Sequence, residues 1–303
     1  PLHHVHGIVN VLGCALWSGA SVEPFVSFDL DRVLDRVGEK AYTVFMAVPT
    51  IYVKMIRAFE SAAPAERQRG AEGFSSVRLM VSGSAALPAS VHERWTELTG
   101  QRLLERYGMT EIGMGLSNPL HGERRPGAVG HPLPRVEVRL ASESDEVITH
   151  EDEPGELQVR GPGVFREYWN QPAVTDASFV DGWFRTGDMA VLEDGYFRIL
   201  GRLSVDIIKS GGHKLSALEI EDVLSQHPAI ADCAVVGLAD ETWGEIVAAA
   251  VVTRADASLD LDGLQAWAGE RLSRYKIPRR LLVVSDFPRN AMGKVVKARL
   301  RRQ

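Results

Sequence analysis

Four short strings of polar residues and glycine occur along this chain in a specific order. They are Tyr-Gly-Met-Thr-Glu at 107–111, Thr-Gly-Asp at 186–188, Gly-Arg at 201–202 and Pro-Arg-Asn-Ala-Met-Gly-Lys at 288–294. Glu111 offers the oxygen ligands that Mg²⁺ takes. Asp188 offers two acceptor oxygens, and Lys294 is a cation on a glycine-containing loop. Any one of these strings could arise by chance, whereas four in this order form a specific pattern.

Each of these residues also has a simpler interpretation. Glu111 would be favoured by the dipole at a helix N-terminus, Asp188 is of a type common in turns, and the simpler interpretation of Lys294 is a solvated lysine. Thr-Gly-Asp alone is a weak string. The longer string that ends at Lys294 is too specific for a solvated lysine to be preferred.

The elements that must position these residues alternate in the first part of the chain. Short apolar runs are followed by helical patterns, which predicts an α/β region with a parallel sheet covered by helices. Ligands of such sheets collect at the carboxyl ends of the strands, so we expect the loops at Thr50, 82–84 and 108–111 to converge on one site. The predicted strands are 43–48, 77–81 and 103–107, the last ending in a turn at Gly108, and the predicted helices are 51–58 and one opened by Pro88.

The pattern changes twice further along the chain. Short alternating strands with Pro and Gly between them predict a β-rich subdomain, and Asp194-Gly195 predicts a tight hairpin within it. An α+β pattern follows, in a segment of ordinary small-domain size. The predicted organisation is 1–117, 118–202 and 203–303; the strands are 136–140, 155–160, 196–200, 233–237 and 247–252, and the helices are 218–226 and 261–273.

The composition bounds the class of protein. The chain has 303 residues, 45% of them hydrophobic and 24% charged, which is typical of a globular protein with real cores. The net charge of −6 argues against a nucleic-acid-binding surface. No stretch approaches the ~18 apolar residues of a membrane span. The last basic residues are predicted to be a solvated helix end: Lys297, Arg299, Arg301 and Arg302.

Two further predictions concern burial and location. The apolar run at 8–16 is predicted to be a core helix. Cys14 and Cys233 lie in apolar surroundings and are predicted to be buried free thiols, which fits a reducing compartment. No targeting segment is visible, and we expect a cytoplasmic or mitochondrial matrix location.

Taken together, the segments at 1–7, 81–85, 105–111, 185–188, 204–212 and 288–294 resemble the acyl-CoA synthetases of the adenylate-forming superfamily. Within it, the strings at 105–111 and 164–170, with Met114 close behind the first, look most like the mitochondrial and bacterial malonyl-CoA synthetases. The resemblance implies a large α/β domain followed by a mobile α+β domain. It also implies that ATP, Mg²⁺ and CoA are used: an acyl-adenylate forms first, and CoA then displaces AMP.

The resemblance gives the motifs their roles at the nucleotide. Lys294 is the adenylation lysine, Glu111 holds Mg²⁺, and Thr110 offers its hydroxyl to a phosphate oxygen. Asp188 accepts the ribose hydroxyls, and Arg202 contacts the ribose or a phosphate. Small residues that let the backbone approach adenine, and a tyrosine that stacks on it, complete the set: Gly83, Ser84, Ala85, Tyr107, Gly108 and Met109.

On the acyl side, His4 matches the histidine near the reacting carboxylate and His6 would line the acyl pocket, although both can be ordinary core or surface histidines. Malonate has a second carboxylate, and its burial without a partner is costly, so the pocket requires a cation. Lys54, where bacterial relatives tend to have arginine, is the first candidate, and Arg94 is the second. Met114 would close the pocket floor, or is simply a packing methionine.

Ser210, Gly211 and Gly212 resemble the loop past which the pantetheine arm of CoA reaches the adenylate, because glycine permits close approach. A hairpin turn is the simpler interpretation. The hinge of the mobile domain is expected at Ser204 or Val205.

The superfamily's Ser/Thr/Gly-rich phosphate loop has no counterpart in this sequence, so the backbone donors that it gives the triphosphate are not found here. We therefore expect a C-terminal portion of a CoA ligase that does not adenylate malonate by itself. The alternatives are a medium- or long-chain acyl-CoA synthetase, an inactive adenylate- or CoA-binding fragment, and adenylation for a carrier protein. The expected partners are a small carboxylate, ATP and CoA, with the oligomeric state open.

Overall fold

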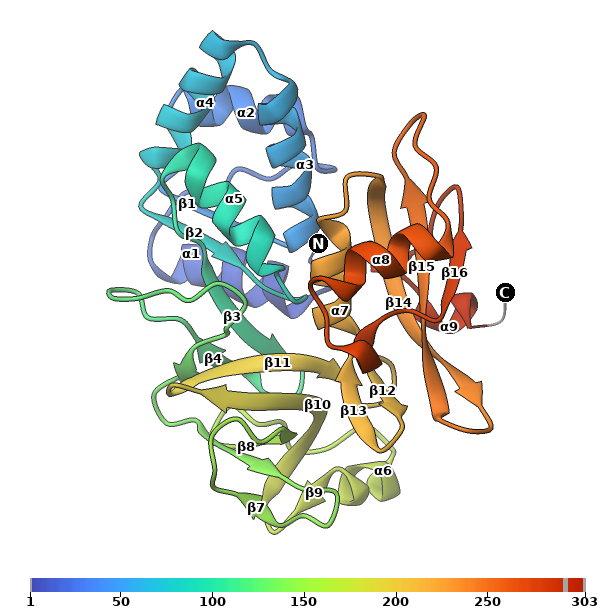
Figure 1. Cartoon of the computed structure of the whole chain (residues 1–303). Coiled ribbons are helices and arrows are strands. Elements are labelled where there is room, and N and C mark those ends of the chain that lie inside the picture. The colour runs from blue at the N-terminus through green and yellow to red at the C-terminus, as the bar shows by residue number, and fades with distance from the viewer. Residues whose placement is uncertain (1, 291–293, 302–303) are drawn as a thin grey trace. The chain divides into compact units, whose positions relative to one another are not determined.

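The computed structural model describes residues 2–290 and 294–301. The chain forms two compact units, and it passes from one to the other several times (Figure 1). The first unit contains Pro1–Asp152, Gln158–Thr186 and Leu192–Arg198. The second contains Glu153–Leu157, Gly187–Val191 and Ile199–Gln303. Among the helices of the described residues, none has the length and apolar character needed to cross a membrane.

The first unit contains a five-stranded mixed sheet with the order β1-β2-β3-β4-β5. Strands β1, β2 and β3 are parallel, which confirms the parallel sheet expected from the sequence, whereas β4 and β5 continue it in antiparallel fashion. The bounds are β1 (Val44–Ala47), β2 (Leu79–Ser82), β3 (Leu104–Met109), β4 (Gly113–Ser117) and β5 (His131–Pro132).

Helices between the parallel strands begin where the sequence provides suitable residues. Proline occupies the first turn of α3 and of α4, where its missing N–H has no cost, and Asp29 caps α2 by accepting from the N–H of Arg32. The helices of this part are α2 (Leu30–Gly38), α3 (Pro49–Ser61), α4 (Pro64–Ser75) and α5 (Ala89–Thr99).

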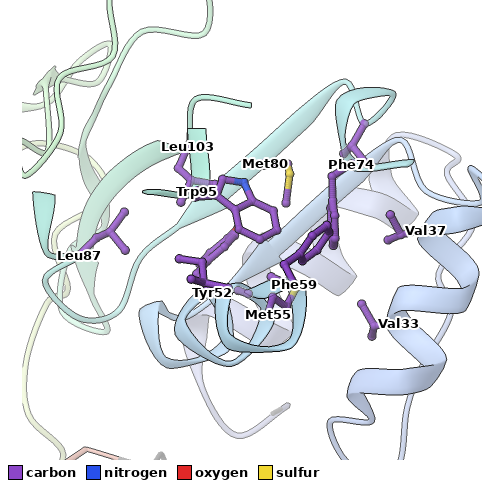
Figure 2. Close-up of a cluster of buried hydrophobic side chains, with 13 residues drawn as sticks. Val33, Val37, Tyr52, Met55, Phe59, Phe74, Met80, Leu87, Trp95 and Leu103 are labelled. Atoms are coloured by element: carbon purple, nitrogen blue, oxygen red, sulfur yellow. The ribbon is translucent and has the colours of Figure 1, made fainter. Parts of the chain in front are cut away.

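These helices pack on the sheet through an aromatic core, drawn in Figure 2. The rings of Phe74 and Trp95 meet edge to face with their centroids 4.8 Å apart, and Tyr52 lies 5.4 Å from Trp95. The hydroxyl of the fully buried Tyr52 donates to the carbonyl oxygen of Val81, 2.8 Å away. The core therefore fixes the carboxyl end of β2, from which the segment 82–86 emerges.

The segment 8–16 was predicted to be a buried core helix, and the prediction of burial is wrong. The segment is helical, as a π-helix η1 (His6–Gly13) followed by α1 (Cys14–Trp17). Its apolar residues lie outside: Val9 is 52% exposed and Trp17 is 93% exposed. The buried residues of η1 are the polar His6 and Asn10, and Cys14 is exposed rather than buried. The polar face of this helix is thus the one that packs on the sheet.

A six-stranded sheet follows, with the order β11-β10-β8-β6-β7 and β9 beside β10. Asp194 and Gly195 both have positive φ, 46° and 77°, and form the tight turn between β10 and β11 that the sequence predicts. The bounds are β6 (Glu137–Ala141), β7 (Val147–Ile148), β8 (Gly155–Arg160), α6 (Pro172–Ala177), β9 (Phe179–Val180), β10 (Trp183–Glu193) and β11 (Tyr196–Arg202).

The rest of the second unit is an α+β region around a sheet with the order β13-β12-β15-β14, with β16 beside β15. Ser216 caps α7 by accepting from the N–H of Glu219, and α8 ends four residues before the predicted end. The bounds are β12 (Ile207–Ser210), β13 (His213–Ser216), α7 (Ala217–Ser225), β14 (Ile230–Asp240), β15 (Gly244–Thr253), α8 (Leu261–Gly269), the 3₁₀ turn η2 (Arg274–Lys276), β16 (Arg280–Val283) and α9 (Lys297–Leu300).

Candidate functional site

The string at 107–111 forms the tip of a β-hairpin in the first unit. Strand β3 continues through Gly108 to Met109, and the turn lies at 110–112, so the turn predicted at Gly108 comes two residues later. A methyl group on Gly108 would lie 2.2 Å from the carbonyl oxygen of Gly113 and 2.3 Å from Cε of Met114. Glycine is therefore required here for the close approach of the two strands.

Glu111 lies in this turn and not at a helix N-terminus, so the helix-dipole interpretation does not apply to it. Its Oε1 accepts a hydrogen bond of 3.0 Å from the hydroxyl of Tyr168, and its carbonyl oxygen accepts from the N–H of Phe165. Thr110 is exposed in the same turn. The described residues contain no group of three His, Cys, Asp or Glu side chains that could hold a metal ion alone. One oriented carboxylate that acts with substrate phosphates fits Mg²⁺.

A second group of predicted residues meets at the carboxyl ends of the parallel strands. His6 Nδ1 lies 3.1 Å from Oγ of Ser84, which follows β2 with a positive φ of 69°. A methyl group on Gly83 would lie 3.8 Å from His6 Nδ1 and 3.4 Å from Cγ of Arg106, so both side chains border this glycine. His4 belongs to the same region, since its Nδ1 accepts from the N–H of His6.

Burial lowers the pKa of His6 to about 4, with smaller contributions from the positive charge of Arg106 and from His4. The imidazole of His6 is consequently neutral at pH 7. Two residues predicted for the adenine side have these surroundings: Ala85 follows Ser84 on the exposed part of the loop, and the hydroxyl of Tyr107 contacts the sulfur of Met109 at 3.8 Å.

The two cations predicted for the acyl pocket have other surroundings. Lys54 is exposed on α3, with its ammonium 5.9 Å from the centroid of the Phe28 ring. Arg94 on α5 is paired with Glu60 and Glu97, each at 2.9 Å. The structure does not bring either cation into contact with His6 or Ser84.

Arg106 is the residue of this region that sequence reasoning missed. It stands inside the string at 105–111, where only its neighbours had been assigned roles. The available signal was the alternation of a strand. Glu105 is buried, with its Oε1 3.0 Å from Nδ1 of His92, and the next side chain points to the other face of the sheet. That face is the one near His6.

In the second unit, Asp188 and Arg202 form an ion pair. Nε of Arg202 lies 2.9 Å from Oδ1 of Asp188, and its Nη2 lies 3.5 Å from Oδ2. Asp188 is only 7% exposed, so the contact is largely shielded from water. Gly187 has a positive φ of 71° and donates its N–H to Oε1 of Glu156. This hydrogen bond holds the backbone just before Asp188.

Lys294 belongs to the same electrostatic group. The residue is exposed and its N–H donates to Oδ1 of Asn290. Partial desolvation of its ammonium lowers the pKa of Lys294, while Asp188 attracts the charge and Arg202 repels it. Three of the four residues first singled out in the sequence are thus neighbours within one unit. The residues 291–293 of the string lie outside the described residues.

The loop at Ser210, Gly211 and Gly212 is a hairpin turn, which agrees with the simpler interpretation of its sequence. Gly211 and Gly212, with φ of 56° and 81°, connect β12 to β13 after the buried Ser210. The N–H of Gly211 donates to the carbonyl oxygen of Trp243, and a methyl group on Gly211 would lie 2.8 Å from the Trp243 ring. A hairpin turn does not exclude contact with a ligand, so the role in CoA binding stays a prediction.

Lys297 is not a solvated residue, contrary to the prediction for the basic end of the chain. It is 8% exposed, and its ammonium lies 2.6 Å from Oδ1 of Asp206 and 2.8 Å from Oε1 of Glu221. Asp206 Oδ2 also accepts from the N–H of Arg202. The predicted hinge residues Ser204 and Val205 lie in the turn between Arg202 and Asp206.

Comparison with known proteins identifies the family of the chain. The family model of the AMP-binding enzyme matches residues 1–169, and that of the AMP-binding enzyme C-terminal domain matches 219–294. The mitochondrial malonate–CoA ligase of Xenopus laevis is 50% identical over 326 residues, which cover 99% of this chain and 56% of the relative. The chain therefore spans about half the length of the curated relatives it matches.

Solved structures also resemble this chain over nearly its whole length. ATP-bound MatB from Rhodopseudomonas palustris has a TM-score of 0.89 at 36% identity, with 100% of this chain and 58% of that chain covered. The o-succinylbenzoate CoA synthetase of Bacillus subtilis, in complex with its acyl-adenylate intermediate, has a TM-score of 0.83 at 29% identity and covers 99% and 59%.

Proposed function

We propose that this chain, which belongs to the family of AMP-binding enzymes, supplies the nucleoside-binding and lysine-bearing part of a carboxylate–CoA ligase. The resemblance to this family is confirmed by the family models. The observation that carries the proposal is the grouping of Asp188, Arg202 and Lys294 in one unit. The name of the Xenopus laevis relative supports malonate, or a similar dicarboxylate, as the acid.

The proposed first step joins the carboxylate to the α-phosphate of ATP and releases pyrophosphate. A carboxylate is a weak nucleophile, and the charge of the triphosphate repels it, so the site must align the two and supply positive charge. Lys294 is suited to this, because its ammonium is partly desolvated and therefore acts more strongly on a nearby anion. Arg202 holds the Asp188 carboxylate in place, and the carboxylate oxygens would accept hydrogen bonds from the ribose hydroxyls.

Mg²⁺ would be held by Glu111, whose orientation is set by Tyr168. When bound, the ion neutralises phosphate charge, which favours attack by an anion. Thr110, next to Glu111, would donate its hydroxyl to a phosphate oxygen. Neutral His6 would border the acyl group without adding charge to it.

In the proposed second step the CoA thiolate attacks the carbonyl carbon of the acyl-adenylate, the C–O bond to phosphate breaks, and AMP leaves. The hairpin at Gly211 and Gly212 carries no side chains, so the pantetheine arm could pass close to its backbone. The name of the Xenopus laevis relative also includes a mitochondrial location, which we propose alongside the cytoplasm for this chain.

The test joins the chain to the part of the Xenopus laevis relative that precedes the match, and measures thioester formation with ATP, Mg²⁺, CoA and a carboxylate panel. We expect malonyl-CoA as the main product, and a loss of more than about 100-fold in ATP–pyrophosphate exchange for Lys294→Ala. The matched control is Arg299→Ala, an exposed cation nearby, with unchanged exchange.

The chain alone is the second control and should show no exchange. Products from monocarboxylates only would contradict the malonate assignment. Equal exchange rates in Lys294→Ala and the unaltered fusion would contradict the role of the lysine.

A further inference from the structure

The segment that bears Lys294 is held on both sides within the second unit. On its N-terminal side, Arg289 forms an ion pair with Asp232 and faces Val295 across an isolated antiparallel bridge. On its C-terminal side, Lys297 begins the short helix α9, three residues after Lys294. The position of the Lys294 backbone therefore depends on a buried lysine that lies close to it in the chain.

Lys297 is buried between two carboxylates of the same unit. Its ammonium lies 2.6 Å from Oδ1 of Asp206 and 2.8 Å from Oε1 of Glu221. The same Oε1 of Glu221 also accepts from the N–H of Val235 at 2.6 Å. Because a buried charge is costly without a partner, the lysine and the two carboxylates hold one another in place.

Asp206 connects this buried cluster to the residues predicted for the nucleotide. Its Oδ2 accepts from the N–H of Arg202, 3.1 Å away, and its own N–H donates to the carbonyl oxygen of Arg202 at 2.8 Å. The side chain of Arg202 in turn pairs with Asp188. A methyl group on Gly201 would lie 2.4 Å from Cβ of Asp206, so the close approach requires glycine. One carboxylate thus contacts both the buried lysine and the backbone of Arg202.

Asp206 is also a competing anion for Lys294. The negative charges of Asp188 and Asp206 both attract the ammonium of Lys294, and the positive charge of Arg202 repels it. Asp188 has Arg202 as its counter-charge, and Asp206 has Lys297. Without Lys297, the uncompensated charge of Asp206 would attract Lys294 more strongly and compete with an anionic substrate.

We propose that Lys297 is a positioning residue for adenylation, which compensates for the charge of Asp206 and anchors the segment that bears Lys294. The ammonium of Lys294 then stays available to the substrate carboxylate and the α-phosphate. Lys297 acts through Lys294 and needs no contact with the substrate. The proposal rests on the proposed function, because that function assigns the alignment of the two reactants to Lys294.

A purely structural role of Lys297 predicts a different behaviour of Lys294. Loss of folding contacts would expose Lys294 whichever member of the ion pair is removed, so its lowered pKa would rise towards the ordinary value in both cases. Charge compensation predicts opposite changes, because removal of the Lys297 charge raises the pKa of Lys294 and removal of the Asp206 charge lowers it. The direction of the change therefore separates the two explanations.

The first experiment measures Lys294 in the chain itself, so that no catalytic step is required. Trace acetylation with acetic anhydride over a range of pH, read by mass spectrometry, gives the pKa of this exposed amine, since only the uncharged amine reacts. We expect a rise of this pKa in Lys297→Met, a fall in Asp206→Asn, and cancellation when both substitutions are combined. Arg299→Met, which removes an exposed cation of the same helix, is the matched control and should cause no change.

Each variant has to be folded, and far-ultraviolet circular dichroism at the assay temperature checks this. If Lys297→Met does not fold, Asp206→Asn decides by itself, because Lys297 keeps Glu221 as its partner in that variant. A pKa of Lys294 that rises or stays unchanged in folded Asp206→Asn overturns the proposal. Lys297→Arg keeps the positive charge and should keep the pKa of Lys294 low.

The second experiment measures ATP–pyrophosphate exchange in the fusion with the preceding part of the Xenopus laevis relative. Lys297→Met should lower kcat by about 10- to 100-fold, the loss expected for a misplaced catalytic group. KM for ATP should hardly change, because Lys294 is proposed to act in the transition state. Addition of Asp206→Asn should recover most of the lost rate, and Arg299→Met should keep the full rate.

The outcomes separate the two proposals. If Lys294→Ala abolishes exchange while folded Lys297→Met changes neither the exchange rate nor the pKa of Lys294, the assignment of Lys297 is wrong and the proposed function stands. If Lys294→Ala exchanges at the full rate, the proposed function fails, and the role of Lys297 in adenylation fails with it.

Discussion

The ammonium nitrogen of Lys297 lies 2.6 Å from Oδ1 of Asp206, in a part of the second unit that is largely closed to water. The same ammonium contacts Glu221 at 2.8 Å. Burial would lower the pKa of Lys297, but the two carboxylates outweigh it and the pKa is raised. Burial raises the pKa of Glu221, and the lysine offsets only part of this. One buried cation thus joins α9 and α7 to the segment that follows Arg202.

Lys297→Met should destabilise the second unit by about 3–5 kcal/mol, because two buried carboxylates lose their counter-charge. Urea unfolding, followed by far-ultraviolet circular dichroism, measures the change. Arg299→Met, on the exposed side of the same helix, is the control and should change the free energy of unfolding by less than about 0.5 kcal/mol. Equal effects of the two substitutions would show that the buried contacts contribute nothing specific.

His6 should make the stability of the chain depend on pH in the acidic range. Its pKa is about 4 in the folded chain and 6.5 in the unfolded chain. Below pH 6.5 the unfolded chain takes up a proton that the folded chain does not, so stability is lost as the pH falls from 6.5 to 4. Unfolding midpoints at pH 7 and pH 5 should therefore differ more for the unaltered chain than for His6→Gln. Parallel pH dependences would contradict the low pKa.

Gly108→Ala should destabilise the first unit by about 1–3 kcal/mol, because the added methyl group meets backbone that cannot yield easily. Gly115→Ala on the facing strand is the matched control. There a methyl group would lie 3.1 Å from Cδ1 of Ile112, a side-chain atom that can move. Thermal unfolding compares the two, and a larger loss for Gly115→Ala would contradict the close approach at Gly108.

Asp188→Asn should weaken the binding of AMP to the chain by about 10- to 100-fold, because one charged acceptor is lost. The binding of 2′,3′-dideoxy-AMP should hardly change, since it has no ribose hydroxyls. Calorimetry with both nucleotides measures the difference, and Asp181→Asn in an exposed turn is the control. Equal losses for both nucleotides would assign Asp188 to structure rather than to the ribose.

Local rules in the sequence predicted much of the fold. The turn at Asp194 and Gly195 depends on two residues that accept positive φ, and such a signal needs no tertiary information. The parallel strands β1, β2 and β3 were likewise apparent, because β1 and β2 are short apolar runs and β3 follows a helical segment and has a glycine near its end. The motifs at Asp188, Arg202 and Lys294 were identified because their order along the chain is specific, and in the structure the three residues interact electrostatically.

Burial was predicted less well, because it depends on partners that are distant in sequence. In the sequence Lys297 has the appearance of a solvated end residue, because its partners Asp206 and Glu221 are distant along the chain. The run at 8–16 is apolar, and yet the buried residues of its π-helix are the polar His6 and Asn10. The alternation of β3 indicates which face Arg106 occupies, but only the folded chain shows that its buried Nε has no acceptor.

The different exposure of the two cysteines has a practical consequence for spectroscopy. Cys14 is exposed on the N-terminal helix, whereas Cys233 lies in the second unit, where burial raises its pKa and suppresses the reactive thiolate. A maleimide fluorophore should therefore attach to a single position without any mutagenesis. Because Cys14 interacts electrostatically with Arg106, the dye would sit close to this residue of β3, and its emission could report ligand binding there in real time.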